Sequence, residues 1–312
     1  MENLKKKPLN STKNQSEKPK SSMNGLETTS ISMKPLEKPL RMGKHTLPNL
    51  KHLSEIYKDV QKDISVRGTV PKHQTGLIDL DEILWGLHKR ELMIIGGKSS
   101  QGKSDFALNI IKNLVDEHRR IIYFSLEMSK EQLVERLLSN FCVIDNQLLR
   151  RGLAKEAISA KENSFIEWID DIKLLIDDSC GYYFDTVLDV CNNIKPEFIV
   201  IDYIQMISIR GHKSKLEAIE DYVRRLKQYA NENNVGIILL SQLNKEGDLK
   251  WAGVLREHPD TVLLLNWDWE KQEYIVTIDK QRHGEIGKIK LEYLPQYSLF
   301  KDWTVKIQKE LL

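Results

Sequence analysis

A glycine-rich stretch in the first third of the chain has the residues needed to bind phosphate groups. It reads GGKSSQGKSDFALN from Gly96 to Asn109 and contains the spacing G-x-x-x-x-G-K-[ST]. Glycines let the backbone curl until several N–H groups point inward, and a following helix adds unpaired N–H groups and a partial positive charge. We therefore expect this loop to bind a nucleotide through Gly97, Lys98, Ser99, Ser100, Gln101, Gly102, Lys103 and Ser104.

Two residues of this loop have separate predicted tasks. Lys103 would reach the β- and γ-phosphates, and the Ser104 hydroxyl would bind Mg²⁺, so the expected ligands are ATP and Mg²⁺. The alternative is an ordinary glycine-rich turn with a solvated lysine. The flanking residues favour nucleotide binding, because ELMIIG before the loop is typical of a buried strand. After it, SDFALNIIKNLVDEH has helical spacing at Phe106, Ile110 and Leu114.

Three further polar residues stand at the ends of apolar, strand-like runs. Asp202 ends FIVID, Glu127 follows IIYFSL, and Gln242 ends GIILLSQ. Nucleotide hydrolysis needs a carboxylate near Mg²⁺, a group that orients water, and hydrogen-bonding groups around the γ-phosphate. The carboxyl ends of parallel strands meet at one edge of a sheet, where ligands bind. Taken alone, Glu127 could equally be a surface glutamate that opens a helix, and Gln242 is weak evidence; together, the three indicate a catalytic edge.

The elements that must position these residues alternate between strands and helices. Helical stretches separate the first five strand candidates, which predicts a largely parallel sheet covered on both faces. The last three follow one another closely and predict an antiparallel C-terminal extension of the same α/β sheet. The eight candidates are 92–96, 121–126, 173–177, 198–202, 236–241, 262–266, 274–279 and 288–293.

The charge of the chain is unevenly distributed. The net charge is +2, but residues 1–50 hold ten Lys or Arg and four Asp or Glu, so they carry +6 and the remainder −4. That first segment also contains five of the nine prolines. It is too polar to offset the entropy lost on ordering, so we predict a disordered basic tail at 1–48. The tail is either a solubilising tether or an arm that contacts nucleic acid or a partner.

A helix is predicted over 49–68, between the tail and a domain at 69–312. Leu50, Leu53, Tyr57, Val60 and Ile64 recur at steps of three and four residues and form one apolar stripe. This stripe must pack against something, either its own domain or a neighbouring subunit.

Composition excludes several classes of protein. No apolar run approaches the roughly 20 residues of a membrane span, and the lysine-rich start lacks the apolar core of a secretory signal. Cys142, Cys180 and Cys191 are odd in number and lack C-x-x-C spacing, which favours thiols in a reducing cytosol. We expect a cytoplasmic protein, in a bacterium or a phage-infected host.

Several motifs occur in one order along the chain. They are YFSLEMSKEQLVERLLS, IVIDYIQMI, RRLKQYANENNVGIILLSQLN and KQRHGEIGKIKLEY, and TGLIDLDEILWGL precedes the phosphate-binding loop. Together with that loop they resemble the RecA-type motor domain of DnaB-like replicative DNA helicases, over roughly residues 66–293. The resemblance implies a RecA-like P-loop NTPase in which Asp202 is the metal-binding carboxylate, Glu127 polarises the attacking water and Gln242 links the γ-phosphate to DNA-binding loops.

The resemblance also implies how the protein assembles. Lys280 and Arg282 resemble the family's pair that acts on the neighbouring subunit's nucleotide, and the family forms rings of six around single-stranded DNA. The predicted 49–68 helix stands where the family has its ring-forming linker. DNA contacts are expected from Arg210, Lys213 and Lys215 in one loop and from Lys250 in a second, which is shorter than in the family. Other replication proteins are further candidate partners.

Three functions are compatible with a phosphate-binding site of this kind. The leading hypothesis is an ATP-dependent helicase that moves along single-stranded DNA in replication. The second is a non-unwinding RecA-like ATPase that binds DNA as an assembly factor or regulator, since both need the same site. A small-molecule phosphotransferase is disfavoured, because it would leave KQRHG unexplained and no acceptor pocket is evident.

Overall fold

The computed structural model describes residues 41–42, 45–46, 51–66, 73–115, 119–179, 183–208, 211–244, 252–268, 270–271 and 273–303. The chain divides into two units, Met1–Arg67 and Gly68–Leu312. Most of the predicted tail lies outside the described residues. Within its range, the two-residue strand β1 (Arg41–Met42) pairs antiparallel with β2 (His45–Thr46).

The first unit also contains the helix α1 (Leu53–Val66), which lies within the range predicted for a linker helix. The stripe residues Leu53, Tyr57, Val60 and Ile64 are all exposed, and Leu50 lies outside the described residues. On the polar side, the Lys51 ammonium forms a 3.0 Å ion pair with Asp59. Within its own unit, α1 therefore presents an apolar stripe to solvent.

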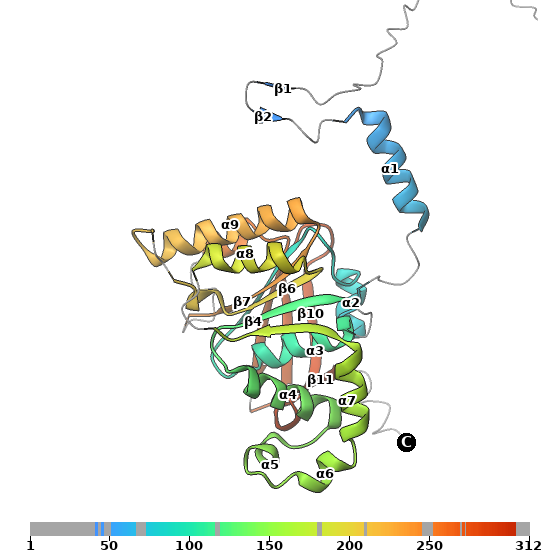
Figure 1. Cartoon of the computed structure of the whole chain (residues 1–312), viewed down its shortest axis with the longest axis vertical. Helices are drawn as coiled ribbons and strands as arrows, with labels where there is room; N and C mark the ends of the chain where they lie inside the picture. The colour runs from blue at the N-terminus through green and yellow to red at the C-terminus, as the bar shows by residue number, and fades with distance from the viewer. Residues whose placement is uncertain are drawn as a thin grey trace, which may run out of the picture. The chain divides into compact units, whose positions relative to one another are not determined.

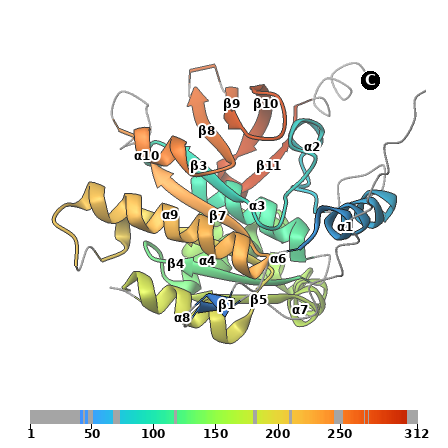
Figure 2. The ribbon, with the colours of Figure 1, turned by 90° about the horizontal axis from the view of Figure 1, so that it is seen from above.

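The second unit is built on a nine-stranded sheet with the order β11-β10-β9-β8-β3-β7-β6-β4-β5. Strands β8, β3, β7, β6, β4 and β5 are parallel, and β9, β10 and β11 continue the sheet antiparallel beyond β8 (Figure 2). The bounds are β3 (Leu92–Gly97), β4 (Arg120–Ser125), β5 (Lys173–Asp177), β6 (Phe198–Asp202), β7 (Gly236–Gln242), β8 (Thr261–Asp268), β9 (Glu273–Gln281), β10 (Gly287–Leu294) and β11 (Leu299–Asp302).

This sheet confirms the predicted fold class, with one difference in detail. The first of the three strands assigned to the antiparallel extension, β8, is antiparallel to β9 but parallel to β3, so it belongs to both parts. The short strand β11 was not predicted. It follows the 3₁₀ turn η2 (Pro295–Tyr297) and a left-handed Ser298, which together reverse the chain onto β10.

Helices cover both faces of the sheet (Figure 1). One core packs α2, α3 and α4 against the sheet, and a second packs α8 and α9 against the other face. A third, small cluster lies among α4, α5, α6 and α7 around Cys142 and Phe165. The bounds are α2 (Ile78–Leu84), α3 (Lys103–Val115), α4 (Lys130–Cys142), α5 (Asn146–Arg150), α6 (Lys155–Ser159), α7 (Glu162–Asp171), α8 (Phe184–Ile194), η1 (Ile204–Met206), α9 (Lys215–Asn233) and α10 (Ala252–Glu257).

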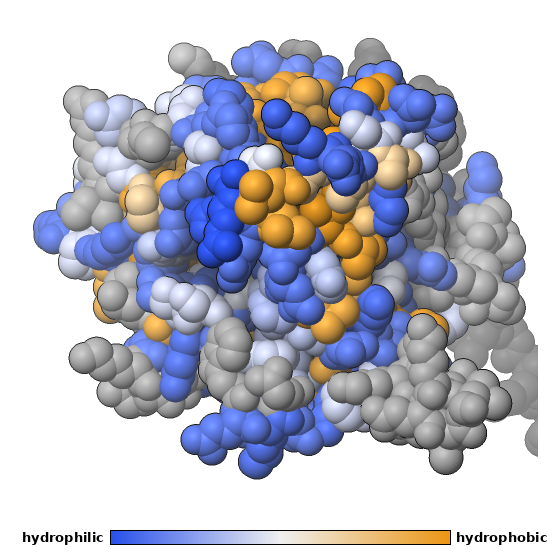
Figure 3. Space-filling model, turned by 90° about the horizontal axis from the view of Figure 1, so that it is seen from below, coloured by the Kyte–Doolittle hydropathy of each residue, from blue (hydrophilic) through white to orange (hydrophobic). Residues whose placement is uncertain are grey.

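Apolar side chains gather on the side of the second unit seen from below in Figure 3, where α5, α6 and α7 lie in Figure 1. The exposed large apolar residues on and between α4 and α7 are Val134, Val143, Leu148, Leu153, Ile166 and Ile169. In the part of the chain that is described, no helix is long and apolar enough to cross a membrane.

The register of the sheet determines where the site forms. Gly97 at the end of β3 is level with Gln242 at the end of β7, and Ser125 at the end of β4 is level with Asp202 at the end of β6. All four strands end at the same edge because they are parallel. The predicted polar strand ends therefore lie side by side.

Candidate active site

The phosphate-binding loop joins β3 to α3 in a tight curve. Ser100 and Gly102 have positive φ angles of 62° and 76°. A Cβ atom on Gly102 would come within 2.8 Å of the Tyr293 ring, so no larger residue fits there without a shift. The Gln101 side chain accepts a 3.0 Å hydrogen bond from the Lys98 N–H, and the Tyr274 hydroxyl donates to the Gln101 carbonyl at 2.7 Å. The loop is thus held in shape by its own residues and by β9.

Lys103 lies within the site that it was predicted to serve. Its ammonium donates to the Lys98 carbonyl at 3.0 Å, across the loop. Burial lowers the pKa of Lys103, and the carboxylates of Asp202 and Glu127 act in the opposite direction. The lysine therefore sits among the predicted catalytic carboxylates.

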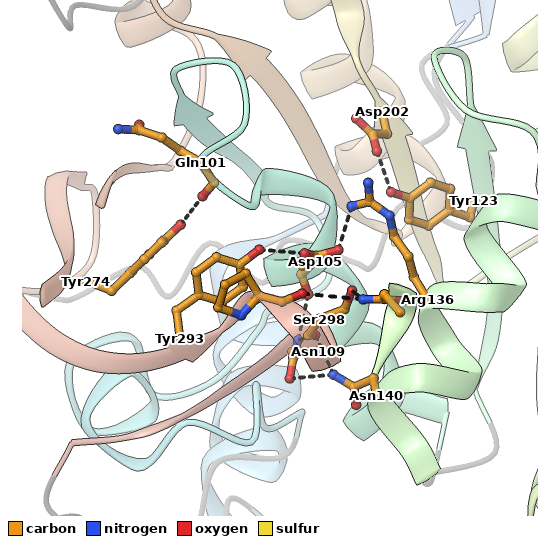
Figure 4. Close-up of polar contacts among 12 residues, drawn as sticks. Gln101, Asp105, Asn109, Tyr123, Arg136, Asn140, Asp202, Tyr274, Tyr293 and Ser298 are labelled. Carbon is orange, nitrogen blue, oxygen red and sulfur yellow. Dashed lines mark hydrogen bonds and ion pairs between the residues drawn. The ribbon is translucent and has the colours of Figure 1, made fainter. Parts of the chain in front are cut away.

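Asp202 is the most deeply buried member of the site. Its Oδ2 accepts a hydrogen bond from the Tyr123 hydroxyl at 2.7 Å (Figure 4). Burial raises the pKa of Asp202, while Ser104, Tyr123 and Lys103 oppose that shift. Oδ1 is buried and has no hydrogen-bond partner among the described residues. A buried carboxylate oxygen without a partner, next to the first turn of α3, fits a Mg²⁺ ion and its water ligands.

A cavity of about 560 Å³ opens over this edge of the sheet. It is lined by the loop from Ser99 to Ser104 and also by Glu127 and Gln242. Glu127 is exposed and stands between the end of β4 and α4, whose first turn is fixed by a capping box between Ser129 and Gln132. The Leu243 N–H donates to the Gly97 carbonyl at 3.1 Å, which ties the chain after Gln242 to the loop. The structure thus brings the loop, Glu127 and Gln242 together around one cavity, with Asp202 beneath.

A second polar network lines the cavity and was not predicted. Asp105 in the first turn of α3 accepts a hydrogen bond from the Arg136 guanidinium of α4 and another from the Tyr293 hydroxyl of β10, both at 2.6 Å (Figure 4). Burial lowers the pKa of Arg136, but the charge of Asp105 outweighs it and raises that pKa overall. Burial, together with the charge of Asp105, raises the pKa of Tyr293. This network fixes α3, α4 and β10 relative to one another.

Sequence signals for these residues exist but are weak. Arg136 lies between the buried Leu133 and Leu137, so a charge stands beside the apolar stripe of α4. Tyr123 is in the fully apolar part of β4, and a buried tyrosine hydroxyl usually needs a partner. Each signal indicates a partner without identifying it.

Lys280 and Arg282 do not line this cavity. The Lys280 ammonium donates to the carbonyls of Arg256 and Glu257 at the end of α10, at 2.7 and 3.0 Å. Burial lowers the pKa of Lys280, and the charge of Arg282 lowers it further. The Arg282 guanidinium donates to Asp260 at 2.9 Å. Within one chain, the pair lies at the opposite edge of the sheet, where the parallel strands begin.

The predicted DNA contacts are described only in part. Lys213 and Lys215 are exposed at the start of α9, whose N-cap Ser214 accepts a hydrogen bond from the Glu217 N–H. Because α9 follows β6, this loop lies on the same side of the sheet as the cavity. Arg210 and Lys250 lie outside the described residues.

Comparisons with known proteins agree with this architecture. A probable replicative DNA helicase of Trieres chinensis is 33% identical over 261 residues, covering 74% of this chain and 57% of that protein. The replicative DNA helicase DnaB of Geobacillus stearothermophilus is 29% identical over 273 residues, covering 80% of this chain and 60% of that protein. The chain therefore spans less than two thirds of the length of the curated relatives that it matches.

Two solved structures share the fold. One is a separate ATPase domain, which superposes with a TM-score of 0.75 at 25% identity, covering 81% of this chain and 99% of that one. The other, a DnaB-like replicative helicase in a structure that concerns its interactions with primase, gives 0.74 at 26% identity and covers 80% of this chain and 68% of that one. The family model of the DnaB-like helicase C-terminal domain matches residues 73–302. The chain belongs to the DnaB-like helicase C-terminal domain family.

Proposed function

We propose that this protein is an ATP-driven, ring-forming motor that moves along single-stranded DNA and separates strands during replication. The observation that carries the proposal is the single cavity that collects the phosphate-binding loop, Glu127 and Gln242 above the buried Asp202. Membership of the DnaB-like family supplies the activity class, and the chemistry of this site is consistent with it.

The loop binds the triphosphate through its backbone N–H groups and the start of α3. Lys103 exchanges the Lys98 carbonyl for the β- and γ-phosphates, because a charged phosphate oxygen is a stronger acceptor than a neutral carbonyl. Its pKa, lowered by burial, returns towards the ordinary lysine value when the phosphate charge arrives beside it. The site thus converts a desolvated cation into binding energy for the nucleotide.

Ser104 and Asp202 would hold Mg²⁺, which supplies charge neutralisation on the β- and γ-phosphates when bound. Asp202 must be ionised for this task. The Tyr123 hydroxyl keeps it ionised and oriented from behind, through Oδ2, and leaves Oδ1 for the metal side. This is the arrangement of a metal-facing carboxylate with a fixed outer hydrogen bond.

Glu127 would accept a proton from the attacking water, since its carboxylate lines the cavity from an exposed position. Gln242 would hydrogen-bond the γ-phosphate and report its presence along β7. The Gln242 N–H faces the Gln205 side chain at 3.4 Å, and Gln205 donates to the Ser241 hydroxyl at 2.9 Å. These contacts connect the strand end to the segment that leads from Asp202 to α9.

Lys280 and Arg282 would complete the site of a neighbouring subunit. A guanidinium can meet two oxygens of the γ-phosphate at once, which suits the charge that develops during transfer. Their position at the far edge of the sheet supports action across an interface. We propose a ring of six subunits, in which the exposed stripe of α1 from one copy packs on the apolar residues of α4–α7 in the next.

DNA binding is proposed at the loops on the cavity side of the sheet. The exposed Lys213 and Lys215 would contact phosphates, which need cations without base-reading groups. Arg210 and Lys250 would add to this contact. The apolar faces leave room for other replication proteins, which remain further proposed partners.

The test is strand displacement on a forked DNA duplex with ATP and Mg²⁺. Wild-type protein should separate the strands, and Glu127→Gln, which keeps the fold and the phosphate loop, should not. ATP hydrolysis without strand separation would assign the protein to the non-unwinding DNA-binding ATPases. Absence of both hydrolysis and DNA binding would reject the motor function altogether.

A further inference from the structure

A fully buried carboxylate, Asp260, stands directly before β8 and is 1% exposed. One of its oxygens, Oδ1, accepts from the Arg282 guanidinium at 2.9 Å. The other, Oδ2, accepts from the Lys227 ammonium at 2.6 Å and from the Leu92 N–H at 2.9 Å. Two cations from separate elements, α9 and the turn after β9, therefore share a single carboxylate.

The backbone holds this carboxylate in place. The Asp260 N–H donates to the Leu92 carbonyl, and the Arg282 N–H donates to the Asp260 carbonyl, each at 2.9 Å. Lys227 also donates to the Arg90 carbonyl at 2.8 Å and is largely buried. Asp260 is thus fixed from both sides before its oxygens meet the cations, so it can act as a rigid point of attachment.

Arg282 differs from Lys227 in exposure. Its side chain is 44% exposed, whereas that of Lys227 is 16% exposed. A guanidinium carries five N–H donors, so the bond from Nη1 to Asp260 leaves donors for a phosphate. Arg282 is therefore held at one end and turned outward at the other.

We propose that Asp260 and Lys227 are positioning residues for Arg282, and that their ion-pair network holds its guanidinium in reach of the adjacent subunit's nucleotide. This inference rests on the proposed action of Arg282 across the interface. Lys227 neutralises part of the charge on Asp260, so Arg282 is held without being trapped by a full negative charge. If Lys227 is removed, Asp260 has Arg282 as its sole cationic partner in the described network and pulls the guanidinium inward.

The cluster matters for turnover more than for binding. The phosphate loop binds ATP in the ground state, whereas a positioned guanidinium acts on charge that develops in the transition state. Misplacement of a catalytic group by about 1 Å can lower the rate by about 10²-fold. We therefore expect Lys227→Met to lower kcat for ATP by about 10- to 100-fold, with KM within about twofold of wild type.

Two substitutions control this measurement. Lys227→Arg keeps a cation against Asp260 and should retain most of the activity. Arg224→Met removes an exposed cation of the same helix that pairs with Asp221 and not with Asp260, and it should leave kcat unchanged.

Mixing experiments separate positioning from general damage. Lys103→Ala subunits lack the phosphate-loop cation but keep Arg282 and its supports, so mixed rings with Lys227→Met contain some complete interfaces. Partial ATPase activity should return in that mixture, and no activity should return when Lys227→Met is mixed with Arg282→Ala. A purely structural defect in Lys227→Met would damage its own nucleotide site, and Lys103→Ala would not rescue it.

The outcomes are decisive in each direction. Wild-type kcat in Lys227→Met, or loss that Lys103→Ala fails to rescue while it rescues Arg282→Ala, overturns the positioning role and leaves the proposed function intact. No recovery between Arg282→Ala and Lys103→Ala, despite demonstrated subunit exchange, overturns action across the interface itself. If thermal unfolding shows that Lys227→Met is not folded, Asp260→Asn takes its place with the same expected rescue pattern.

Discussion

The hydrogen bond from Tyr123 to Asp202 provides the sharpest test of the metal site. Tyr123→Phe removes one buried oxygen and keeps the ring, so the core of β4 is preserved. The change leaves the carboxylate with neither oxygen supported by that hydroxyl, because Oδ1 already has no partner among the described residues. The effect should therefore appear in Mg²⁺ binding and not in the fold.

The magnitude follows from the contact. A hydrogen bond to a charged group contributes about 1.5–3 kcal/mol. Ser104 and Lys103 still favour the ionised carboxylate after the substitution, so the lower value applies, and about 1.4 kcal/mol corresponds to tenfold in an equilibrium constant. Loss of an outer-sphere partner of a metal ligand typically lowers metal affinity by about 10- to 100-fold. We expect a fall of about tenfold in Mg²⁺ affinity.

The pH dependence has a definite sign. The tyrosine hydroxyl donates to the ionised carboxylate and thus opposes the rise in the pKa of Asp202 that burial causes. Its removal raises that pKa further, and activity needs the ionised form, so activity is lost as the pH falls through the pKa. The acid limb of the ATPase profile should therefore move to higher pH in Tyr123→Phe.

The assay is ATP hydrolysis as a function of Mg²⁺ concentration, repeated from acidic to alkaline pH. Tyr229→Phe is the matched control, because Tyr229 is a buried tyrosine of α9 in the other core, away from the site. The same Mg²⁺ requirement and the same acid limb in Tyr123→Phe and wild type would refute the role given to Asp202.

Four further outcomes are expected. Lys103→Ala should abolish ATP binding or turnover with an unchanged circular dichroism spectrum, and normal hydrolysis would reject the phosphate-loop assignment. Glu127→Gln should keep ATP binding but hydrolyse it about 10²- to 10⁴-fold more slowly, as single-turnover kinetics would show. Tyr293→Phe should lower the free energy of unfolding in urea by about 1.5–3 kcal/mol, because a buried carboxylate on α3 loses a donor. Deletion of residues 1–45 should leave ATPase activity nearly unchanged, whereas deletion of 1–67 should reduce the assembly to small species in light scattering.

The strands that carry the site could be read from the sequence because each is a continuous apolar run with a polar end. The runs that became β3, β4, β6 and β7 were each predicted to within a residue at either end. Parallel strands share an edge, so their polar ends could also be expected to meet. The pairing of β8 with β3 could not be read in this way, because closeness along the chain favours β9 as the partner, and only the full sheet adds the second neighbour.

The supporting network could not be predicted, because its members are distant along the chain. Tyr123 is 79 residues from Asp202, and Tyr293 is 188 residues from Asp105. Each is an ordinary residue of a strand or helix until the fold supplies its partner. Composition shows that a buried hydroxyl or guanidinium needs a partner, but tertiary packing alone decides which carboxylate it meets.

The arrangement of the two edges explains why one chain does not suffice for the proposed mechanism. Gly97 is level with Leu265 on β8, whereas Met93 is level with Thr261, which in turn pairs with Gln281 on β9. Four residues along a strand span about 13 Å, so the end of β9 lies at least that far from the start of the phosphate loop along the strand direction. A lysine or arginine side chain held by Asp260 and by the end of α10 does not cross that distance within its own sheet. A second copy, with its cavity facing this edge, places the same cations beside a nucleotide, and the hydrolytic site is then shared between two subunits.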